Sequence, residues 1–263
     1  MAMDFSKVKS ITIPEGSVSK ITISNKIVWQ KIDLSPYNVL PYLVATDASR
    51  AWIDLGIPYQ NGCRAEYKIT LKNTATIFGV FYTTERCRGY VETSRAVFNV
   101  GTAASNAVYP SVDIITTDTV YTITNQANPN ATITVNGKNY TSNIDTQYLT
   151  WDSSPHNMYL FAANRKDTNS RAWGTRVIHY FKYWDVNNNL LLDLIPVERK
   201  SDNVLGMFNK VNGQFLTNIA DGTFYKELPA NWTRIKIYDY ILRHEFTQVN
   251  EVRVSDNTGL NNL

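Results

Sequence analysis

Charged residues are scarce in this 263-residue chain, at 19% of the sequence against about 25% in an average globular protein. The 26 Lys and Arg residues are interspersed with 23 Asp and Glu residues, giving a net charge of +3 and no basic stripe. No apolar run approaches the roughly 20 residues of a membrane-spanning helix, and the opening MAMDFSKVKSITIPEG lacks the apolar core of a signal peptide. We therefore expect no nucleic-acid binding, no membrane insertion and no Sec-dependent export.

Cysteine and histidine are also rare. The two cysteines, Cys63 and Cys87, are too few for a disulfide framework. One bridge between neighbouring strands is possible, but two ordinary, partly buried thiols are the preferred interpretation. The three histidines lie far apart, and none has a second His or Cys at a metal-ligand spacing.

The sequence motifs of catalysis are missing as well. There is no Glu-x-Asp-x-x-Glu set for glycoside hydrolysis, no Gly-x-Ser-x-Gly elbow and no Gly-rich phosphate loop. We predict a protein that is not an enzyme and that needs no cofactor. Several Asp and Asn residues in loops have side-chain oxygens that could bind calcium: Asp152, Asn164, Asp167, Asn169 and Asp221. Turns require the same residue types, so we prefer a turn role for these residues.

Short β-rich runs separated by turn signals fill most of the chain and predict an all-β fold. From Tyr42 to about Lys226 turn signals recur every 8–12 residues, which is typical of an antiparallel β-sandwich. They include Asn136-Gly137, the three asparagines at 187–189 and Asn212-Gly213. Both faces of the run at 175–185 are largely apolar, so we expect a central strand there. Pro196 should end the apolar run at 190–197 or mark a sheet edge.

The first 31 residues differ from the rest. Runs at 8–13, 18–23 and 26–31 predict a three-stranded β module with one apolar face. So small a sheet cannot bury that face against itself, so we expect it to dock on the next domain, on other copies of the chain or on another protein. The assembly or anchoring residues would be Ile11, Ile13, Ile21, Ile23, Ile27 and Trp29. The stretch at 32–41, in which Pro36 and Pro41 bracket four residues, reads as a stiff connection, and we place the module at 1–35.

Several motifs in the sequence resemble a known family. DLIPVERKSD at 193–202, GMFN at 206–209, VNGQF at 211–215 and GTF at 222–224 are similar in order and spacing to the closing signature of laminin-G-like, concanavalin-type sandwich domains of phage and prophage structural proteins. The stretch after Tyr42 looks like the opening of the same domains. The first segment, VKSITIPEGSVSKITISNKIVWQK, resembles a small module that recurs in phage virion proteins. The family frequently has Asp where this chain has Asn209, so the resemblance gives no support for a metal at that turn.

The resemblance implies a laminin-G-like sandwich over 36–226 of a virion protein. Its sharpest binding hypothesis is a glycan site, because sugar rings stack on aromatic faces and accept hydrogen bonds from nearby polar groups. We place that site at Trp173 in the polar loop NRKDTNSRAWG, with Arg165, Asn169 and Arg171. Trp52, Tyr59 and Trp151 are weaker candidates, since aromatic residues in strand-like runs usually fill the core.

About 37 residues follow the family signature. This extension at 227–263 has apolar residues whose spacing fits a helix or a strand, and we expect it to make a subunit or virion contact through Ile235, Leu242 and Phe246. The whole chain is then a phage virion accessory protein of tail, fibre or head, assembled in the host bacterial cytoplasm. We expect it to bind other virion proteins, to form a homo-oligomer, most simply a trimer, and to attach to a host-surface glycan. The alternative is a purely structural decoration or fibre protein without a ligand.

Overall fold

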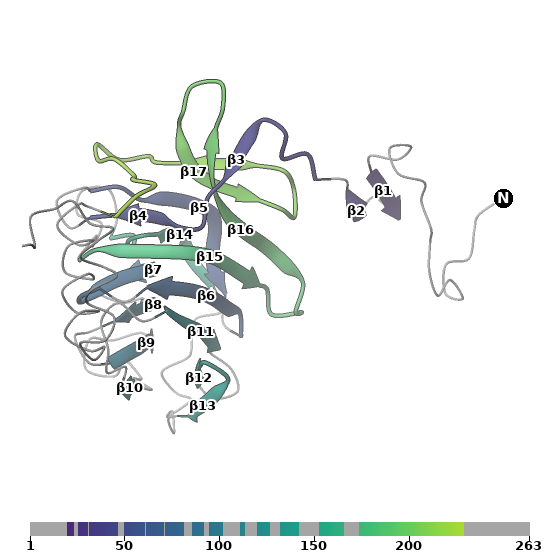
Figure 1. The fold of residues 1–263 in the computed structure, drawn as a ribbon. Helices are drawn as coiled ribbons and strands as arrows, with labels where there is room; N and C mark the ends of the chain where they lie inside the picture. The colour runs from purple at the N-terminus through teal and green to yellow at the C-terminus, as the bar shows by residue number, and fades with distance from the viewer. Residues whose placement is uncertain are drawn as a thin grey trace, which may run out of the picture.

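In the computed structural model the chain folds into two large antiparallel β-sheets and one two-stranded sheet (Figure 1). The structure describes residues 20–23, 26–30, 32–46, 50–60, 62–70, 72–81, 86–91, 95–101, 111–113, 120–126, 132–141, 153–165 and 174–228. Every regular element in these ranges is a strand. The predicted all-β, antiparallel sandwich is therefore confirmed. The described part of the chain holds no helix of the length and apolarity that crossing a bilayer takes.

One sheet has six strands. In spatial order they are β10 (Ser111–Asp113), β9 (Arg95–Gly101), β8 (Arg86–Val91), β7 (Ala75–Phe81), β14 (Ser153–Leu160) and β5 (Ile53–Gln60).

The other sheet has ten strands. Its main path is β13 (Lys138–Thr141), β12 (Thr132–Val135), β11 (Val120–Gln126), β6 (Arg64–Thr70), β15 (Arg176–Trp184), β16 (Leu190–Arg199), β17 (Leu205–Asn209) and β18 (Phe215–Thr217). Two short strands join beside this path: β3 (Tyr37–Val39) pairs with β16, and β4 (Leu43–Ala45) pairs with β15.

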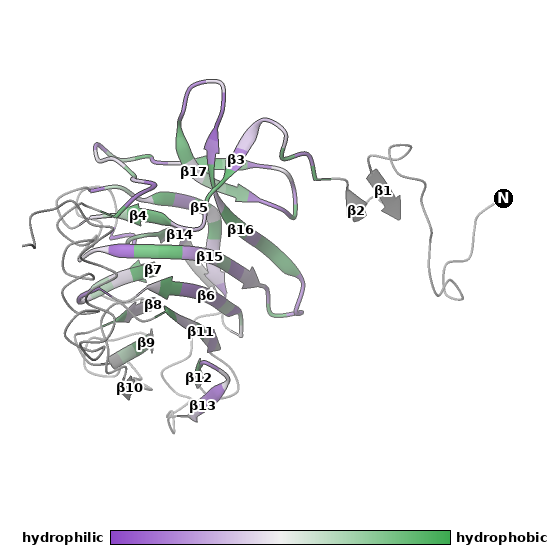
Figure 2. Ribbon diagram, in the orientation of Figure 1, coloured by the Kyte–Doolittle hydropathy of each residue, from purple (hydrophilic) through white to green (hydrophobic). Residues whose placement is uncertain are grey.

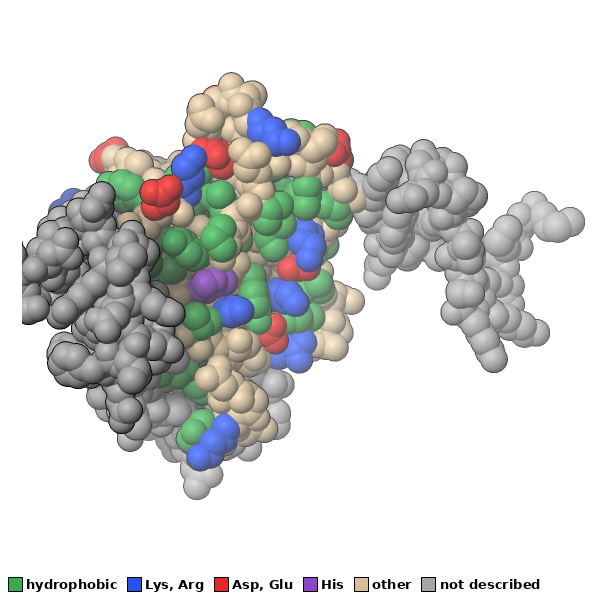
Figure 3. Space-filling view, viewed as in Figure 1, with side chains coloured by type: hydrophobic (Ala, Val, Ile, Leu, Met, Phe, Trp, Pro, Cys, Tyr) green, Lys and Arg blue, Asp and Glu red, His purple; other side chains and the backbone are tan. Residues whose placement is uncertain are grey.

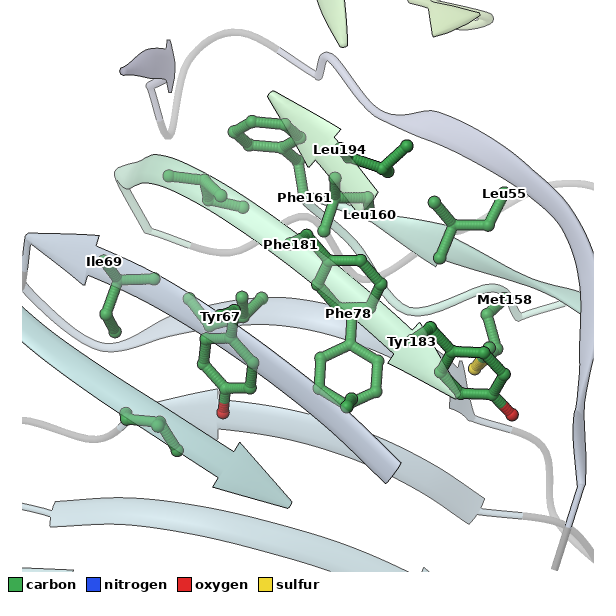
Figure 4. Close-up of a cluster of buried hydrophobic side chains, with 14 of the residues drawn as sticks. Leu55, Tyr67, Ile69, Phe78, Met158, Leu160, Phe161, Phe181, Tyr183 and Leu194 are labelled. Atoms are coloured by element: carbon green, nitrogen blue, oxygen red, sulfur yellow. The ribbon is translucent and has the colours of Figure 1, made fainter. Parts of the chain in front are cut away.

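Aromatic side chains from both sheets meet in the core (Figure 4). Phe78 of the six-stranded sheet packs against Tyr67 and Phe181 of the ten-stranded sheet, with ring centroids 5.5 and 5.2 Å apart. All three side chains are buried. Aromatic packing of this kind contributes roughly 0.5–1.5 kcal/mol per pair beyond the burial of apolar area, so these contacts help hold the two layers together.

β15 lies in the middle of the ten-stranded sheet, as the run at 175–185 predicts. It pairs with β6 along nearly its whole length and with β4 and then β16 on the other side. Phe181 and Tyr183 point into the core, while Tyr180, Lys182 and Trp184 are half-buried on the outer face. Over β6, β15 and β16 this outer face mixes charged side chains of both signs with apolar ones (Figure 3). β4, by contrast, is buried and hydrophobic along its length (Figure 2).

The prediction that Pro196 ends its strand or marks an edge is wrong. β16 continues to Arg199, and Pro196 lies opposite Met207 of β17. On its other side, β15 pairs with β16 up to Leu194 and β3 pairs from Val197. Pro196 falls between the part of β16 that pairs with β15 and the part that pairs with β3, so its missing N–H interrupts neither of these pairings.

The stretch at 32–41 is more than a connection. Tyr37–Val39 forms β3, and the Leu40 N–H donates to the carbonyl of Pro196 at 2.9 Å. Three of the four residues between Pro36 and Pro41 form this strand. They pair with the part of β16 that β15 leaves unpaired.

The predicted turns at Asn136-Gly137, at 187–189 and at Asn212-Gly213 are present. Asn136, Gly137, Asn188 and Gly213 have φ values of 47, 83, 60 and 77°, in the left-handed region that Asn and Gly tolerate best. Asn-Gly joins β12 and β13 as a two-residue hairpin loop.

Two of the three predicted N-terminal strands are described. β1 (Lys20–Ile23) and β2 (Lys26–Gln30) pair antiparallel, with Ile21 opposite Trp29. A bulge after Ile21 places Ile27 opposite Thr22. The first predicted strand, with Ile11 and Ile13, lies outside the described residues, as do Ile235, Leu242 and Phe246 of the C-terminal extension.

Candidate functional site

Of the four residues predicted to bind a glycan, the structure describes one. Arg165 is exposed directly after β14, whereas Asn169, Arg171 and Trp173 lie outside the described residues, as does Trp151. Tyr59 is wrong as a binding candidate, because only 1% of it is exposed and it belongs to the core. Trp52 is half-buried and packs partly against that core.

The turn after β14 fixes the position of Arg165. Phe161 has a φ of 69°, and the chain then runs beside β7 in parallel, with the Asn164 N–H donating to the carbonyl of Gly79. The Phe81 N–H in turn donates to the carbonyl of Asn164 at 2.8 Å. Arg165 therefore lies at the C-terminal end of β7. The far side of the same loop meets the other end of this strand, since the Thr175 N–H donates to Asn73 Oδ1 at 2.8 Å.

Four half-buried side chains gather on the outer face of the neighbouring strands β5 and β14. Ile53 and Leu55 of β5 point into the core, so by alternation Trp52 and Asp54 face outward. On β14, Met158 and Leu160 are buried, and the outward residues are Asn157 and Tyr159. These four are Trp52, Asp54, Asn157 and Tyr159, and we call them the outer-face cluster.

The two aromatic rings of the outer-face cluster lie nearly parallel. The Trp52 and Tyr159 rings have centroids 6.4 Å apart and an interplanar angle of 14°. Trp52 is held from its backbone, because its N–H donates to Asn218 Oδ1 and its carbonyl accepts from Ile219 N. The pair forms a partly exposed aromatic surface at the edge of the six-stranded sheet, where β5 is the last strand.

Beside these rings lies a fixed carboxylate. Asp54 Oδ1 accepts a hydrogen bond from the Gly56 N–H at 2.8 Å, and Oδ2 accepts one from Asn157 Nδ2 at 3.3 Å. The carbonyl of Asn157 accepts from Asn164 Nδ2 at 2.8 Å. A carboxylate offers about four acceptor positions, so these two contacts orient Asp54 and leave it able to accept from a ligand hydroxyl.

A second group on the same face pairs guanidinium groups with aromatic rings. The Arg88 Cζ lies 4.3 Å from the Phe81 ring centroid and 4.2 Å from that of Tyr90. The Arg165 Cζ lies 5.7 Å from the same Phe81 ring. Strand register joins this group to the outer-face cluster, because Asp54 pairs with Tyr159, Tyr159 with Gly79 and Gly79 with Arg88.

The sequence analysis named Trp52 and Arg165 of this face but missed Asp54, Phe81, Arg88, Tyr90, Asn157 and Tyr159. The alternation in IDLGIPYQ and SSPHNMYL, the sequences of β5 and β14, could have shown which positions face outward. It could not have shown that two strands about 100 residues apart are neighbours.

The described residues contain no group of three or more His, Cys, Asp or Glu side chains able to hold a metal ion. Asn209, where the resembled family often has Asp, has a structural role. Its Oδ1 accepts from the backbone N–H groups of Asp193 and Val211 at 3.1 and 3.0 Å, and the residue is fully buried. His179 also bonds within the fold, to Thr70 Oγ1 and the Pro41 carbonyl.

No protein-family model matches the sequence, and a comparison with curated proteins gives no match. Solved structures are similar at low identity. A heptameric SAP-like pentraxin from Limulus polyphemus is 11% identical, with 56% of this chain and 77% of that chain covered and a TM-score of 0.41. A putative carbohydrate binding protein from Bacteroides ovatus is 12% identical over 72% of this chain and 60% of its own, with a TM-score of 0.48. The botulinum neurotoxin type G receptor binding domain is 14% identical over 76% and 78%, with a TM-score of 0.35. At such identities the likeness bears on the fold alone.

Proposed function

We propose that the sandwich is a glycan-binding module and that the outer-face cluster is its site. One observation carries the proposal: the stacked Trp52 and Tyr159 rings lie beside the oriented Asp54 carboxylate on the same face. A pyranose ring has apolar C–H faces and a rim of hydroxyls, so aromatic rings contact the faces while carboxylate and amide groups bond the rim. The loop residues Asn169, Arg171 and Trp173 remain predicted contributors to the same activity.

We further propose that this module acts on a phage virion, where it attaches particles to a host-surface glycan. The resemblance of 193–224 and of the N-terminal segment to phage structural modules supports this assignment. One small, wet site gains little after the cost of ordering, and a dissociation constant near 1 mM corresponds to only about 4 kcal/mol. Repeated copies on a particle would supply the missing strength by avidity. Detection of this chain in purified virions by mass spectrometry tests the location, and its absence from them would overturn it.

Tyr159→Ala tests the site. The variant should weaken binding of multivalent protein to host cells or to a glycan array at least about tenfold, because stacking on the ring is lost, while Tyr159→Phe keeps most of it. Tyr180→Ala is the matched control, since Tyr180 is also half-buried but lies on the outer face of the other sheet. Melting temperatures of all three variants separate loss of binding from loss of folding.

Two results would count against the site. Unchanged binding by a folded Tyr159→Ala variant would exclude the outer-face cluster as the site. Glycan binding by Asp54→Asn is a second test of the site, and this variant leaves the aromatic packing intact. If wild-type oligomers bind no host cell and no glycan, the alternative of a decoration or fibre protein without a ligand replaces the proposal.

Assembly is part of the same proposal. We expect the chain to form a closed oligomer, a trimer, through the extension at 227–263. Light scattering of the purified protein, before and after truncation at Lys226, should show a fall in mass. A full-length monomer would contradict it.

A further inference from the structure

Two guanidinium groups share one aromatic ring on the outer face of the six-stranded sheet. Arg88 is held between the Phe81 and Tyr90 rings, at 4.3 and 4.2 Å, and is almost fully buried. Arg165 approaches the same Phe81 ring at 5.7 Å, and its side chain is exposed. The ring thus brings two cationic side chains together, and an anion bound to the exposed Arg165 would be attracted to it.

Arg165 is the member of this pair that a ligand can reach. Among the described residues it forms no ion pair, and it contacts the Phe81 ring. Contact with the ring orients a planar guanidinium and leaves its N–H donors free in the plane. That geometry suits two-point hydrogen bonding to a carboxylate, sulfate or phosphate group.

The pair adjoins the outer-face cluster. Phe81 lies two positions beyond Gly79 on β7, about 7 Å along the strand, and Gly79 pairs with Tyr159. On the other side, Asn164 precedes Arg165 in the chain and bonds the carbonyl of Asn157. A ligand stacked on the aromatic rings therefore has Arg165 as its neighbour toward the C-terminal end of β7.

We propose that the site selects an anionic glycan: one sugar ring lies on the Trp52 and Tyr159 rings, and an acidic substituent on it or on the next unit bonds to Arg165. The inference rests on the proposed function of the outer-face cluster and adds the chemical class of its ligand. Asp54 of β5 is separated in register from Arg88 of β8 by Tyr159 and Gly79, so the same face carries an acceptor for hydroxyls on one strand and guanidinium donors for the acid on others.

Matched polymers test the charge preference. Polygalacturonate and its methyl ester share a backbone and differ in carboxylate charge, and dextran sulfate and dextran differ in sulfate. Wild-type protein should bind at least one charged polymer about tenfold more tightly than its uncharged partner, with an advantage that shrinks as salt rises. Binding of polygalacturonate would indicate a carboxylate ligand, and binding of dextran sulfate would indicate a sulfate ligand.

Variants assign the preference to Arg165. Arg165→Gln should remove most of the advantage of the charged polymer and leave binding of the uncharged one unchanged, and Arg165→Lys should keep part of the advantage. Lys138→Gln is the control: it removes the same charge from a residue that also contacts a ring, Tyr140 at 5.1 Å, on the edge strand of the other sheet.

The outcomes separate this inference from the proposed function. Equal binding of charged and uncharged polymers that Tyr159→Ala still abolishes would overturn the charge preference and leave the glycan site standing. A preference that Arg165→Gln does not change would overturn the role of Arg165. If the protein binds none of the four polymers and no anionic glycan on an array, the inference is overturned, even if it binds uncharged glycans. If Tyr159→Ala leaves the binding of a glycan unchanged, the proposed function is overturned instead.

Discussion

His179 Nδ1 lies 2.9 Å from the carbonyl oxygen of Pro41, and this hydrogen bond joins β15 to the turn between β3 and β4. A carbonyl only accepts, so Nδ1 carries the proton. Nε2 is then an acceptor in the neutral ring, and Thr70 Oγ1, 2.8 Å away, donates to it. Tyr42 packs edge-on against the imidazole at 5.7 Å.

This environment predicts a stability change between neutral and mildly acidic pH. Burial, with Lys68 as a smaller cause, lowers the pKa of His179 below its ordinary value, although the bond to Pro41 opposes the shift. Below about pH 6.5 the unfolded chain then binds a proton that the folded chain does not. The free energy of unfolding is highest above that pH and falls as pH drops toward the folded pKa.

Urea denaturation at pH 7.5 and pH 5 measures the effect. His179→Asn keeps a side-chain donor for Pro41 and cannot titrate, so its midpoint should fall less on acidification than that of the wild type. Equal falls in the two proteins would show that His179 does not contribute.

The two cysteines should be unreactive in the folded protein. Cys63 and Cys87 are free thiols, 3% and 1% exposed. Burial raises the pKa of Cys63 to about 12 and also raises the pKa of Cys87. Because the thiolate is the reactive form, a thiol reagent at pH 8 should modify neither residue until denaturant is added, and then both. Rapid modification of the native protein would contradict the burial of these side chains.

Gly79 and Gly56 offer a matched pair of glycine substitutions beside the candidate site. At Gly79, with φ at +131°, an added Cβ would lie 2.0 Å from the carbonyl oxygen of Cys87. Gly79→Ala should therefore lower the free energy of unfolding by about 3 kcal/mol or more. Gly56 has φ at +67° and open space around it, so Gly56→Ala should cost only about 1 kcal/mol. Chemical denaturation of both variants checks the order, and a smaller loss at Gly79 would refute the close strand approach.

Asn209 should be more important for stability than its turn position implies. Its replacement by Ala leaves the N–H groups of Asp193 and Val211 without their acceptor and the carbonyl of Leu191 without its donor. Because Asn209 is fully buried and these hydrogen bonds are partly buried, we expect a loss of about 2–3 kcal/mol. Asn212→Ala, at the exposed turn nearby, removes one acceptor from Gln214 N and should cost under about 1 kcal/mol. Similar losses for the two variants in denaturation experiments would contradict this role.

Local patterns predicted the strands and turns well, and long-range pairing explains most of what they missed. The alternation around Phe181 and Tyr183 marks a strand, and Asn136-Gly137 marks a hairpin, from a few neighbouring residues. Pro196 reads as a strand end in isolation, and only the positions of β3 and β15 on one side of β16 show why it is tolerated.

The same reason limited prediction of the candidate site. Asp54 and Asn157 meet across two strands whose residues are 103 positions apart, and period-2 alternation gives the face of a side chain but not its cross-strand neighbour. Arg165 was predicted as a glycan ligand because its loop is polar and aromatic. Its contact with Phe81 depends on the turn at Phe161, which no local signal indicated.

Deletion of residues 1–31 tests the proposed anchoring role of the N-terminal module. β1 and β2 form a sheet of their own, and within the described residues no strand pairing joins them to either large sheet. The sandwich from β3 onward should therefore keep its thermal transition within a few degrees of the wild type, whereas the truncated protein should no longer enter virions. Unchanged incorporation into particles would exclude the anchoring role. Loss of the sandwich's own transition would show instead that the apolar face of the module packs on the sandwich of the same chain.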